Sequence, residues 1–399
     1  MKKILFVVNT LGRAGAELSL LSLLRKLNGK GYELSLYVLM NQGEMIKEVP
    51  SYVRIKNTGF SSQSVLSRAG RYGLIKAVLK AFFRNGGYIR KLRTMVKNLI
   101  HMLRIGRIQT DKLLWRVAAD GAERFPEHYD LAIAWLEGGS AYYVADWVNA
   151  KKKAAFIHID YKKAGYTREM DGNCWKRFDR IFAVSDDARK KFLDVYPELK
   201  NTTAVFPNIV DQEYIRLRAK EKGGFTDPYD GARILTVGRL TYQKGYDIAV
   251  EAMQILKSSG YYARWYVLGE GDQREKLEKK IAMLGLEDDF VLLGAVENPY
   301  PYYAQADLYV HAVRYEGQGI AVWEAQTLGC AVIVSDYCGS RGQIMDGKYG
   351  ISCRLTPEGI AESIRFLLDD RKKREELGRM AAEKKVPEGQ ERLFFDLLE

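Results

Sequence analysis

Short apolar segments alternate with helical stretches along the whole chain, and this rhythm constrains the fold more than any other feature. Six of these segments precede residue 209 and five follow it. We expect the following to be strands: Ile4–Val8, Leu34–Met40, Leu131–Trp135, Ala154–His158, Ile181–Ser185, Thr203–Phe206, Ile234–Val237, Trp265–Leu268, Phe290–Leu293, Leu308–His311 and Ala331–Ser335. Continuous apolar strands that alternate with helices are typical of parallel, doubly wound sheets. A chain of 399 residues is also too long for one ordinary core. The sequence therefore predicts an α/β fold with two domains, residues 1–208 and 209–387, whose sheets face each other across a cleft.

The composition narrows the class of protein. With 47% hydrophobic and 28% charged residues, the chain is globular rather than disordered. Its four cysteines and four histidines are scattered, which indicates neither a disulfide framework nor a metal site. The run Ile4–Val8 is a short buried strand rather than a signal peptide, and no stretch approaches the ~20 apolar residues of a membrane span. We therefore expect a cytoplasmic protein.

Two glutamates, Glu316 and Glu324, lie eight positions apart and suggest a ligand site. Glycines follow Glu316 and let the backbone approach a ligand closely, and Glu324 lies about two turns along a helix expected over residues 320–328. The N-terminus of a helix presents unpaired N–H groups and a positive dipole end to anionic or hydroxyl-rich ligands. Two such carboxylates could grip two parts of one elongated, polyhydroxylated molecule. On spacing alone, a loop residue and a solvated helix face explain them equally well.

Four motifs that occur in order along the chain resemble a known family. They are Gly15-Ala-Glu17, Val237–Gly245, Val267–Gly271 and Glu316–Glu324. Together they resemble family 4 of the retaining glycosyltransferases, over nearly the whole chain. The resemblance implies the GT-B fold of two facing Rossmann-like domains, the first binding an acceptor and the second a nucleotide-sugar donor. It also implies that a terminal helix over residues 388–399 packs back on the first domain.

The resemblance assigns expected roles to individual residues. Arg239 and Lys244 match the basic pair that neutralises the donor diphosphate, a stabilisation that needs no metal. Glu316 matches the residue that contacts the transferred sugar, and Glu324 the one that binds the ribose hydroxyls. His158 resembles the histidine that faces the donor sugar, although a lone histidine at a strand end is more often structural. The other expected donor contacts lie at Gly15, Gly238, Gly269, Gly317, Gln318, Gly319 and Ile320.

The chain departs from the family pattern at two positions. Gln318 replaces the common Phe after Glu-Gly, and Gly342 stands where relatives often carry a glutamate, which puts sugar selectivity and donor geometry in doubt. No Asp-x-Asp motif is convincing, so we expect neither a required metal nor another cofactor. The implied mechanism is transfer with retention of anomeric configuration by front-face displacement, in which the leaving phosphate takes the acceptor's proton. Positioning and electrostatic stabilisation would supply most of the rate.

Residues 61–119 form a strongly basic segment. They hold thirteen Lys or Arg and one acid, Asp111, so that their net charge equals the +12 of the whole chain. Two helical stripes of apolar residues are expected within it: Leu74, Ile75, Val78, Leu79, Phe82 and Phe83, and then Leu92, Met95, Val96, Leu99, Ile100 and Leu103. Basic amphipathic helices favour an anionic membrane surface. Alternatively, the apolar faces pack on the first domain and the cations are solvated. Nucleic acid is disfavoured as the partner because few aromatic residues lie among the basic ones.

These features together predict a retaining, metal-independent hexosyltransferase on the inner face of the cytoplasmic membrane. It would extend a glycan acceptor, lipid-linked in this interpretation, in the assembly of capsule, exopolysaccharide or another cell-surface polysaccharide. One alternative is a nucleotide-sugar 2-epimerase of the same fold, which would not need the basic helices. Another is a non-catalytic sugar-nucleotide-binding or membrane scaffold protein, against which the intact Arg239, Lys244, Glu316 and Glu324 argue.

Overall fold

The chain forms two compact units. The structure is a computed structural model and describes residues 1–65, 67–104, 110–337, 339–345, 347–385 and 389–399. Unit 1 comprises Met1–Ile209 together with Pro387–Glu399, and unit 2 comprises Val210–Val386. The expected end of the second domain at residue 387 lies outside the described residues.

Unit 1 is built on a seven-stranded parallel sheet with the strand order β3-β2-β1-β4-β5-β6-β7. Its strands are β1 (Lys2–Val8), β2 (Tyr32–Val38), β3 (Arg54–Ile55), β4 (Tyr129–Ala134), β5 (Ala150–Ile157), β6 (Arg180–Ala183) and β7 (Thr203–Val205). All six strands expected before residue 209 overlap a strand of this sheet. Only β3 was not predicted, because it has two exposed residues and therefore no apolar run.

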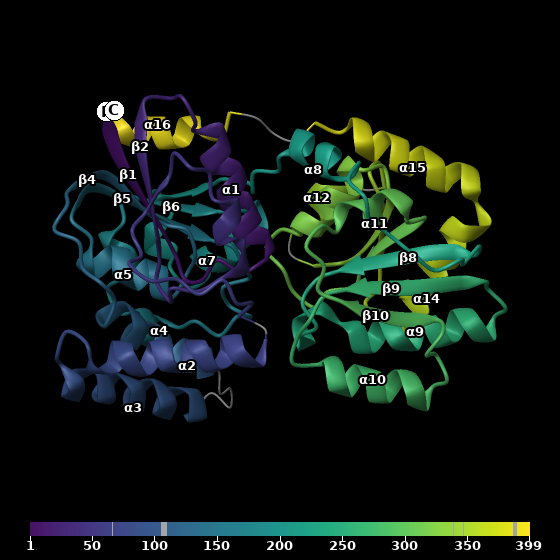
Figure 1. Cartoon of the computed structure of the whole chain (residues 1–399), viewed down its shortest axis with the longest axis horizontal. Helices are drawn as coiled ribbons and strands as arrows, with labels where there is room; N and C mark the ends of the chain where they lie inside the picture. Colours follow the sequence, from purple (N-terminus) through teal and green to yellow (C-terminus); the bar gives the residue numbers. More distant parts are fainter. Residues whose placement is uncertain (66, 105–109, 338, 346, 386–388) are drawn as a thin grey trace. The chain divides into compact units, whose positions relative to one another are not determined.

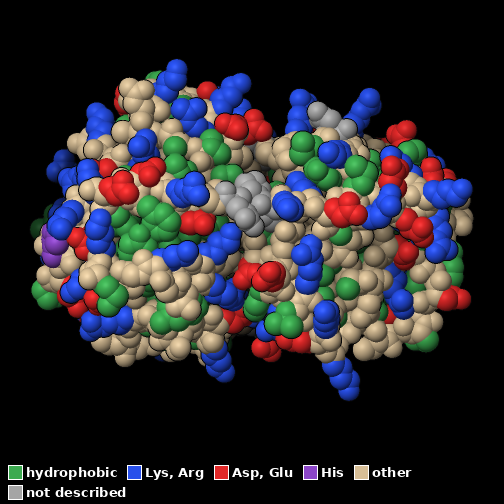
Figure 2. Space-filling view, turned by 90° about the horizontal axis from the view of Figure 1, so that it is seen from above, with side chains coloured by type: hydrophobic (Ala, Val, Ile, Leu, Met, Phe, Trp, Pro, Cys, Tyr) green, Lys and Arg blue, Asp and Glu red, His purple; other side chains and the backbone are tan. Residues whose placement is uncertain are grey.

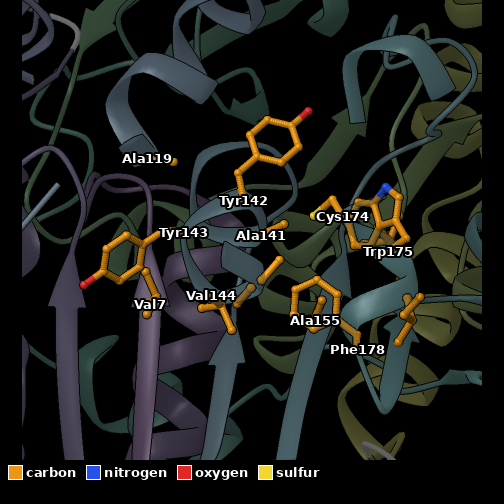
Figure 3. Packing of buried hydrophobic residues seen from close by; sticks show 14 of the residues in the cluster. Val7, Ala119, Ala141, Tyr142, Tyr143, Val144, Ala155, Cys174, Trp175 and Phe178 are labelled. Atoms are coloured by element: carbon orange, nitrogen blue, oxygen red, sulfur yellow. The ribbon is translucent and has the colours of Figure 1, made fainter. Parts of the chain in front are cut away.

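Two hydrophobic layers cover the two faces of this sheet. Successive side chains of a strand point to opposite faces. Accordingly, Leu5 and Val7 belong to one buried cluster, and Ile4, Phe6 and Val8 belong to the other. Figure 3 shows part of the first cluster, in which Val7 of β1 and Ala155 of β5 lie near the buried side of helix α5 (Gly139–Trp147). Apolar side chains on both faces explain why the strands read as continuous apolar runs.

The other helices of unit 1 surround the sheet. They are α1 (Gly15–Lys26), α2 (Arg68–Phe83), α3 (Tyr88–Arg104), α4 (Thr110–Asp120), α6 (Arg168–Asp171), α7 (Asp186–Leu193) and α16 (Arg392–Leu398), with short 3-10 turns η1 (Glu44–Glu48), η2 (Trp175–Arg177) and η3 (Pro197–Leu199). The terminal helix α16 returns to this unit. Its Phe394 is buried, with ring centroids 5.9 Å from Phe156, 5.6 Å from Phe182 and 4.8 Å from Phe206.

Helices α2, α3 and α4 form an additional layer at the edge of unit 1, with α3 outermost (Figure 1). Leu74 and Val78 of α2 pack against the core, whereas Ile75, Leu79 and Phe83 of the same expected stripe are exposed. On α3 the expected apolar stripe faces outward almost entirely. Its exposed members are Leu92, Val96, Leu99, Ile100 and Leu103. Packing on the domain therefore accounts for only part of the first stripe. The basic residue Arg107 lies outside the described residues.

Unit 2 has a six-stranded parallel sheet with the order β10-β9-β8-β11-β12-β13. Its strands are β8 (Ala232–Val237), β9 (Ala263–Leu268), β10 (Phe290–Gly294), β11 (Leu308–His311), β12 (Ala331–Ser335) and β13 (Ile351–Cys353). Its helices are α8 (Gln212–Arg218), η4 (Tyr242–Lys244), α9 (Tyr246–Ser258), α10 (Arg274–Met283), α11 (Tyr300–Gln305), α12 (Ile320–Thr327), α13 (Ser340–Ile344), α14 (Pro357–Asp369) and α15 (Arg371–Glu383). The five expected strands are present, and two parallel sheets confirm the predicted α/β fold class.

Candidate functional site

The strand order of unit 2 places a crevice beside its two central strands. The sheet grows outward from β8 through β9 to β10 on one side, and from β11 through β12 to β13 on the other. Connections that leave β8 and β11 therefore run in opposite directions. In open α/β sheets, ligands bind outside the carboxyl ends of strands at such a switch point. Here the loop after β8 leads to Lys244, and the loop after β11 carries Glu316.

The two loops meet in a buried network of polar side chains. Lys244 Nζ donates a hydrogen bond to Glu316 Oε1 at 2.7 Å, and His311 Nε2 lies 2.5 Å from Glu316 Oε2. The Glu316 side chain is only 19% exposed and that of His311 1% exposed. The hydroxyl of Tyr309 lies 3.1 Å from His311 Nδ1, which extends the network along β11. Glu316 is therefore a held carboxylate, and the interpretation as an ordinary loop residue is wrong.

The protonation states in this network follow from its contacts. Burial raises the pKa of Glu316, but the adjacent Lys244 and His311 outweigh burial and lower that pKa to about 2. Burial also lowers the pKa of His311, against the opposing effect of Glu316. A neutral imidazole beside an ionised carboxylate carries its proton on the nitrogen that faces the carboxylate. His311 therefore donates from Nε2 to Glu316, and its Nδ1 accepts from Tyr309.

Glycines bring backbone close to this network. Gly319 N–H donates to Gln343 Oε1 at 3.0 Å, and Gln343 Nε2 donates back to Gly319 O at 2.7 Å. A Cβ on Gly319 would lie 2.8 Å from the Tyr337 hydroxyl and 3.1 Å from His311 Nε2, so only glycine fits there without moving these side chains. A Cβ on Gly269 would collide with the carbonyl oxygen of Gly238. Gly238, Gly269 and Gly319 thus belong to closely packed loops at the carboxyl edge of the sheet, and Ile320 begins α12 beside them.

Glu324 lies further along α12 and is also buried. Its Oε1 accepts a hydrogen bond from the hydroxyl of Tyr300 at 3.1 Å, and its Oε2 accepts one from Tyr303 at 3.0 Å. Both tyrosines belong to α11. A carboxylate that is 4% exposed with two hydroxyl donors is not a solvated helix face. That interpretation is wrong, and the expected role toward ribose stays a prediction.

Arg239 differs from Lys244, its expected partner. It lies in the loop after β8 and is exposed, and within the described part of the chain its side chain forms no hydrogen bond or ion pair. Lys244, in contrast, is 13% exposed and is held by Glu316. The loop therefore offers two positive charges. That of Arg239 lies on an exposed side chain, and that of Lys244 is held by the carboxylate of Glu316.

The expected residues of unit 1 lie at the carboxyl edge of its own sheet. Gly15 begins α1 after β1, and His158 follows β5. The His158 ring is buried, 5.6 Å from the Trp135 centroid and 5.7 Å from that of Phe156. Burial lowers the pKa of His158 to about 3, so the ring is neutral. Its backbone N–H donates to Glu137 Oε2 at 3.0 Å.

Three buried polar residues, two in unit 1 and one in unit 2, were not singled out from the sequence. Glu137 and Asn9 meet between β1 and β4, where Asn9 Nδ2 donates to Glu137 O at 3.1 Å. The glycines that follow Glu137 after a predicted strand are a detectable signal for such an edge. His311 is the third. It lies at the end of a predicted strand, five residues before Glu316, but scattered histidines gave no cluster in the sequence.

Comparisons with known proteins bear on unit 2 first. Residues 218–384 match the family model described as glycosyl transferases group 1. The match lies within unit 2 and covers less than half of the chain. A Campylobacter jejuni protein named N-acetylgalactosamine-N,N'-diacetylbacillosaminyl-diphospho-undecaprenol 4-alpha-N-acetylgalactosaminyltransferase is 30% identical over 169 residues, which cover 42% of this chain and 44% of that protein. The amylovoran biosynthesis glycosyltransferase AmsK of Erwinia amylovora is 33% identical over 144 residues, 34% of this chain and 35% of that protein. The matches span less than half of each relative.

The fold of the whole chain has a solved counterpart. A crystal structure of S. aureus TarM aligns with 100% of this chain and 100% of its own, with a TM-score of 0.68 and 14% sequence identity. Identity at this level shows the fold alone. Together with the two parallel sheets, it confirms the predicted GT-B class, whereas membership of family 4 and the retaining outcome stay predictions.

Proposed function

We propose that this protein is a retaining glycosyltransferase that moves a sugar from a nucleotide-sugar donor to a lipid-linked glycan in the assembly of a cell-surface polysaccharide. The observation that carries the proposal is the Lys244–Glu316–His311 network at the switch point of a group 1 glycosyltransferase domain. It provides a cation and an oriented carboxylate where an open α/β sheet binds its ligands.

The chemistry assigns one task to each part of the network. The bond from the sugar's anomeric carbon to the donor phosphate breaks, and a bond from that carbon to an acceptor oxygen forms on the same face. The acceptor's proton passes to the leaving phosphate. Arg239 and Lys244 stabilise the negative charge that grows on the diphosphate, and Glu316 binds the sugar through its hydroxyls. His311 is the positioning residue that keeps Glu316 in place when Lys244 turns to the diphosphate.

The remaining donor contacts complete the proposed site. Glu324 receives the ribose hydroxyls, with Tyr300 and Tyr303 fixing the carboxylate. Backbone groups of residues 317–320 and of Gly238 and Gly269 lie along the sugar and phosphates. The roles expected of Gly15 and His158 in unit 1 stay predictions.

The lipid-linked acceptor is supported by relatives and by charge. The name of the Campylobacter relative includes a diphospho-undecaprenol group, and that of the Erwinia relative refers to amylovoran biosynthesis. On the face shown in Figure 2, Lys and Arg side chains are interspersed with Asp and Glu. Helices α2 and α3, in contrast, contain no acidic residue in their sequences. This basic pair of helices matches the negative surface of an anionic membrane.

The orientation of α3 also favours an anionic membrane as the partner. Its exposed apolar residues form one stripe, at 55% exposure for Leu92, 47% for Val96 and 58% for Leu103. A different side of the helix is buried and holds Lys91, Asn98 and Met102. An amphipathic helix whose apolar side faces outward lies in a membrane interface. Within the described residues, no helix is long and apolar enough to cross a membrane.

Lys91 is not available to lipid. Its ammonium group donates to the carbonyl oxygens of Ala81 at 2.8 Å, Phe82 at 3.0 Å and Arg84 at 2.6 Å, so that it caps the end of α2. A test of membrane docking therefore has to spare it. The exposed cations Arg93, Lys97 and Arg104 of α3 are the appropriate set to neutralise.

Docking is tested by co-sedimentation with vesicles that contain phosphatidylglycerol. The triple variant Arg93→Gln/Lys97→Gln/Arg104→Gln should lose most of its binding, since each surface cation contributes about 1 kcal/mol, and wild-type binding should weaken with salt. Leu92→Ser/Val96→Ser should also reduce binding without unfolding unit 1. Equal sedimentation of wild type and the triple variant would overturn electrostatic docking.

The enzymatic proposal is tested with a panel of nucleotide sugars. The wild-type protein should release free nucleotide from at least one of them, with and without a chelator. Lys244→Met should abolish that release. A wild type that releases nucleotide only when a divalent metal is supplied would contradict the metal-independent mechanism. A product formed from donor alone would favour the epimerase instead.

A further inference from the structure

A polar pocket lies in unit 1 beneath helix α2. It has a volume of about 430 Å³ and lies at the carboxyl edge of the sheet, where the loops that follow β2 and β3 meet α2. One face of α2 forms its wall, through Gly73, Ala77 and Lys80, together with Arg84 at the C-cap of the helix. These positions are spaced by three or four residues, so they lie on one side of an α-helix. The position matches the rule that open α/β sheets bind ligands beyond the carboxyl ends of their strands.

The α2 side of the pocket has small residues that leave space and basic residues that supply positive charge. Gly73 and Ala77 are small and leave space, and a Cβ on Gly73 would lie 2.8 Å from Gln42 Oε1. Lys80 and Arg84 follow at one end. Arg84 pairs with Glu123 at 3.7 Å, and Glu123 lines the same end of the pocket. Lys80 forms no side-chain hydrogen bond or ion pair within the described residues, so it supplies the positive charge that is not balanced inside the protein.

Helix α2 has three distinct sides, and their order around the helix axis determines where an apolar chain and an attached anion could lie. One side packs on the core through Leu74 and Val78. A second is exposed and apolar, with Leu79 at 55% and Phe83 at 66% exposure. The third is the pocket wall. At 3.6 residues per turn, Lys76 and Lys80 lie between the exposed apolar side and the rest of the pocket wall. An apolar chain on the outer side would therefore bring an attached anion to Lys80.

We propose that this pocket binds the phosphate-bearing junction of a lipid-linked acceptor, with Lys80 and Arg84 on the phosphate oxygens and the polar loop residues around the first sugar. Asn41 and Ser61 line that polar end. The inference rests on the proposed function, because it assigns the acceptor to unit 1, and it specifies the acceptor's chemistry: an apolar chain joined to a sugar through phosphate.

The test uses two variants that remove the same charge from the same helix. Lys80→Gln alters the pocket, whereas Lys76→Gln alters an exposed cation that does not line it and contacts the Tyr72 ring at 4.6 Å. Binding of farnesyl diphosphate to the full-length protein is measured by calorimetry. Lys80→Gln should weaken binding about tenfold, the scale of one lost contact to a charged group, and Lys76→Gln by less than about twofold. Equal effects of the two substitutions would overturn the pocket as the site.

A second arm distinguishes a lipid phosphate from a free one. Inorganic pyrophosphate should bind at least about tenfold more weakly than farnesyl diphosphate, because it lacks the apolar chain that lies along Leu79 and Phe83. Equal affinity would contradict the lipid-linked ligand. Nucleotide release from the donor should be unchanged in Lys76→Gln. A wild type that releases no nucleotide would refute the proposed function, whereas normal release with no effect of Lys80→Gln on farnesyl diphosphate would refute this inference alone.

Discussion

Replacing His311 tests whether a buried histidine holds the acidic centre of unit 2. In His311→Leu, Glu316 keeps Lys244 but loses the donor that lies 2.5 Å from its Oε2. A hydrogen bond to a charged group contributes about 1.5–3 kcal/mol. If the carboxylate must be oriented for transfer, that loss corresponds to a decrease of about 10- to 150-fold in kcat/KM. Tyr309 also loses its partner, so a moderate loss of stability is expected.

A pH profile separates positioning from a general loss of structure. In the wild type the pKa of Glu316 lies near 2, so this group gives no acidic limb above about pH 3. Without His311 one of the groups that lowers this pKa is gone, and the pKa moves back toward the ordinary value of about 4.3. Nucleotide release by His311→Leu should therefore fall as the pH drops below about 5, because protonation removes the carboxylate.

The matched control is His311→Gln, which can still donate to Glu316. It should recover part of the activity and keep the wild-type acidic limb. Tyr309→Phe should cause a smaller loss, since it removes only the group that fixes the imidazole tautomer. Activity of His311→Leu within about twofold of wild type, with an unchanged pH profile, would refute the positioning role.

Four other changes have outcomes that the structure specifies. Arg239→Ala should reduce nucleotide release at least about tenfold without changing the melting temperature, because the side chain is exposed and forms no hydrogen bond or ion pair with the described residues. Unchanged release would remove it from the site. Glu324→Gln should weaken nucleotide binding more than it slows transfer, as calorimetry and kinetics together would show, and the reverse order would contradict the ribose role. Lys91→Met should destabilise unit 1 by about 2–4 kcal/mol in chemical denaturation, since three carbonyl groups lose their donor, whereas Arg93→Met should not. The stability of wild type relative to His158→Gln should fall as the pH drops from about 6.5 toward 3, because the unfolded chain binds a proton there and the folded ring, with its pKa near 3, does not.

Much of the fold was predictable because parallel strands buried on both faces leave an unambiguous pattern. The run Ile4–Val8 and the run Ala331–Ser335 contain no exposed residue, and each forms a central or near-central strand. Strands β3 and β13 were not predicted, and the reason is physical. They are two and three residues long at the sheet edges, where pairing on one side suffices and no apolar run is needed.

The site was only partly predictable, because sequence spacing does not show burial. Glu316 and Glu324 were selected from their spacing, but the partners that make them unusual come from other elements. Lys244 reaches Glu316 across 72 positions, and Tyr300 reaches Glu324 across 24. His311 could not be selected from the sequence around it, because its role depends on the loop after β11 folding back toward the end of that strand.

The apolar stripes of α2 and α3 show the same limit. Helical periodicity identified both correctly, yet periodicity cannot tell which way a stripe faces. On α3 the buried residues are Lys91, Asn98 and Met102, and Lys91 is buried because it caps the neighbouring helix. The direction of that face was decided by tertiary contacts.

The central claim is that the switch point of unit 2 binds a nucleotide diphosphate through Lys244. Calorimetric titration of the wild type with UDP, GDP and ADP tests it most directly, alongside Lys244→Met and the control Lys257→Met, whose lysine pairs with Asp289. We expect at least one nucleotide to bind the wild type and the control equally, and to bind Lys244→Met at least about tenfold more weakly. Equal affinity for all three proteins, or no binding to the wild type, would contradict the account.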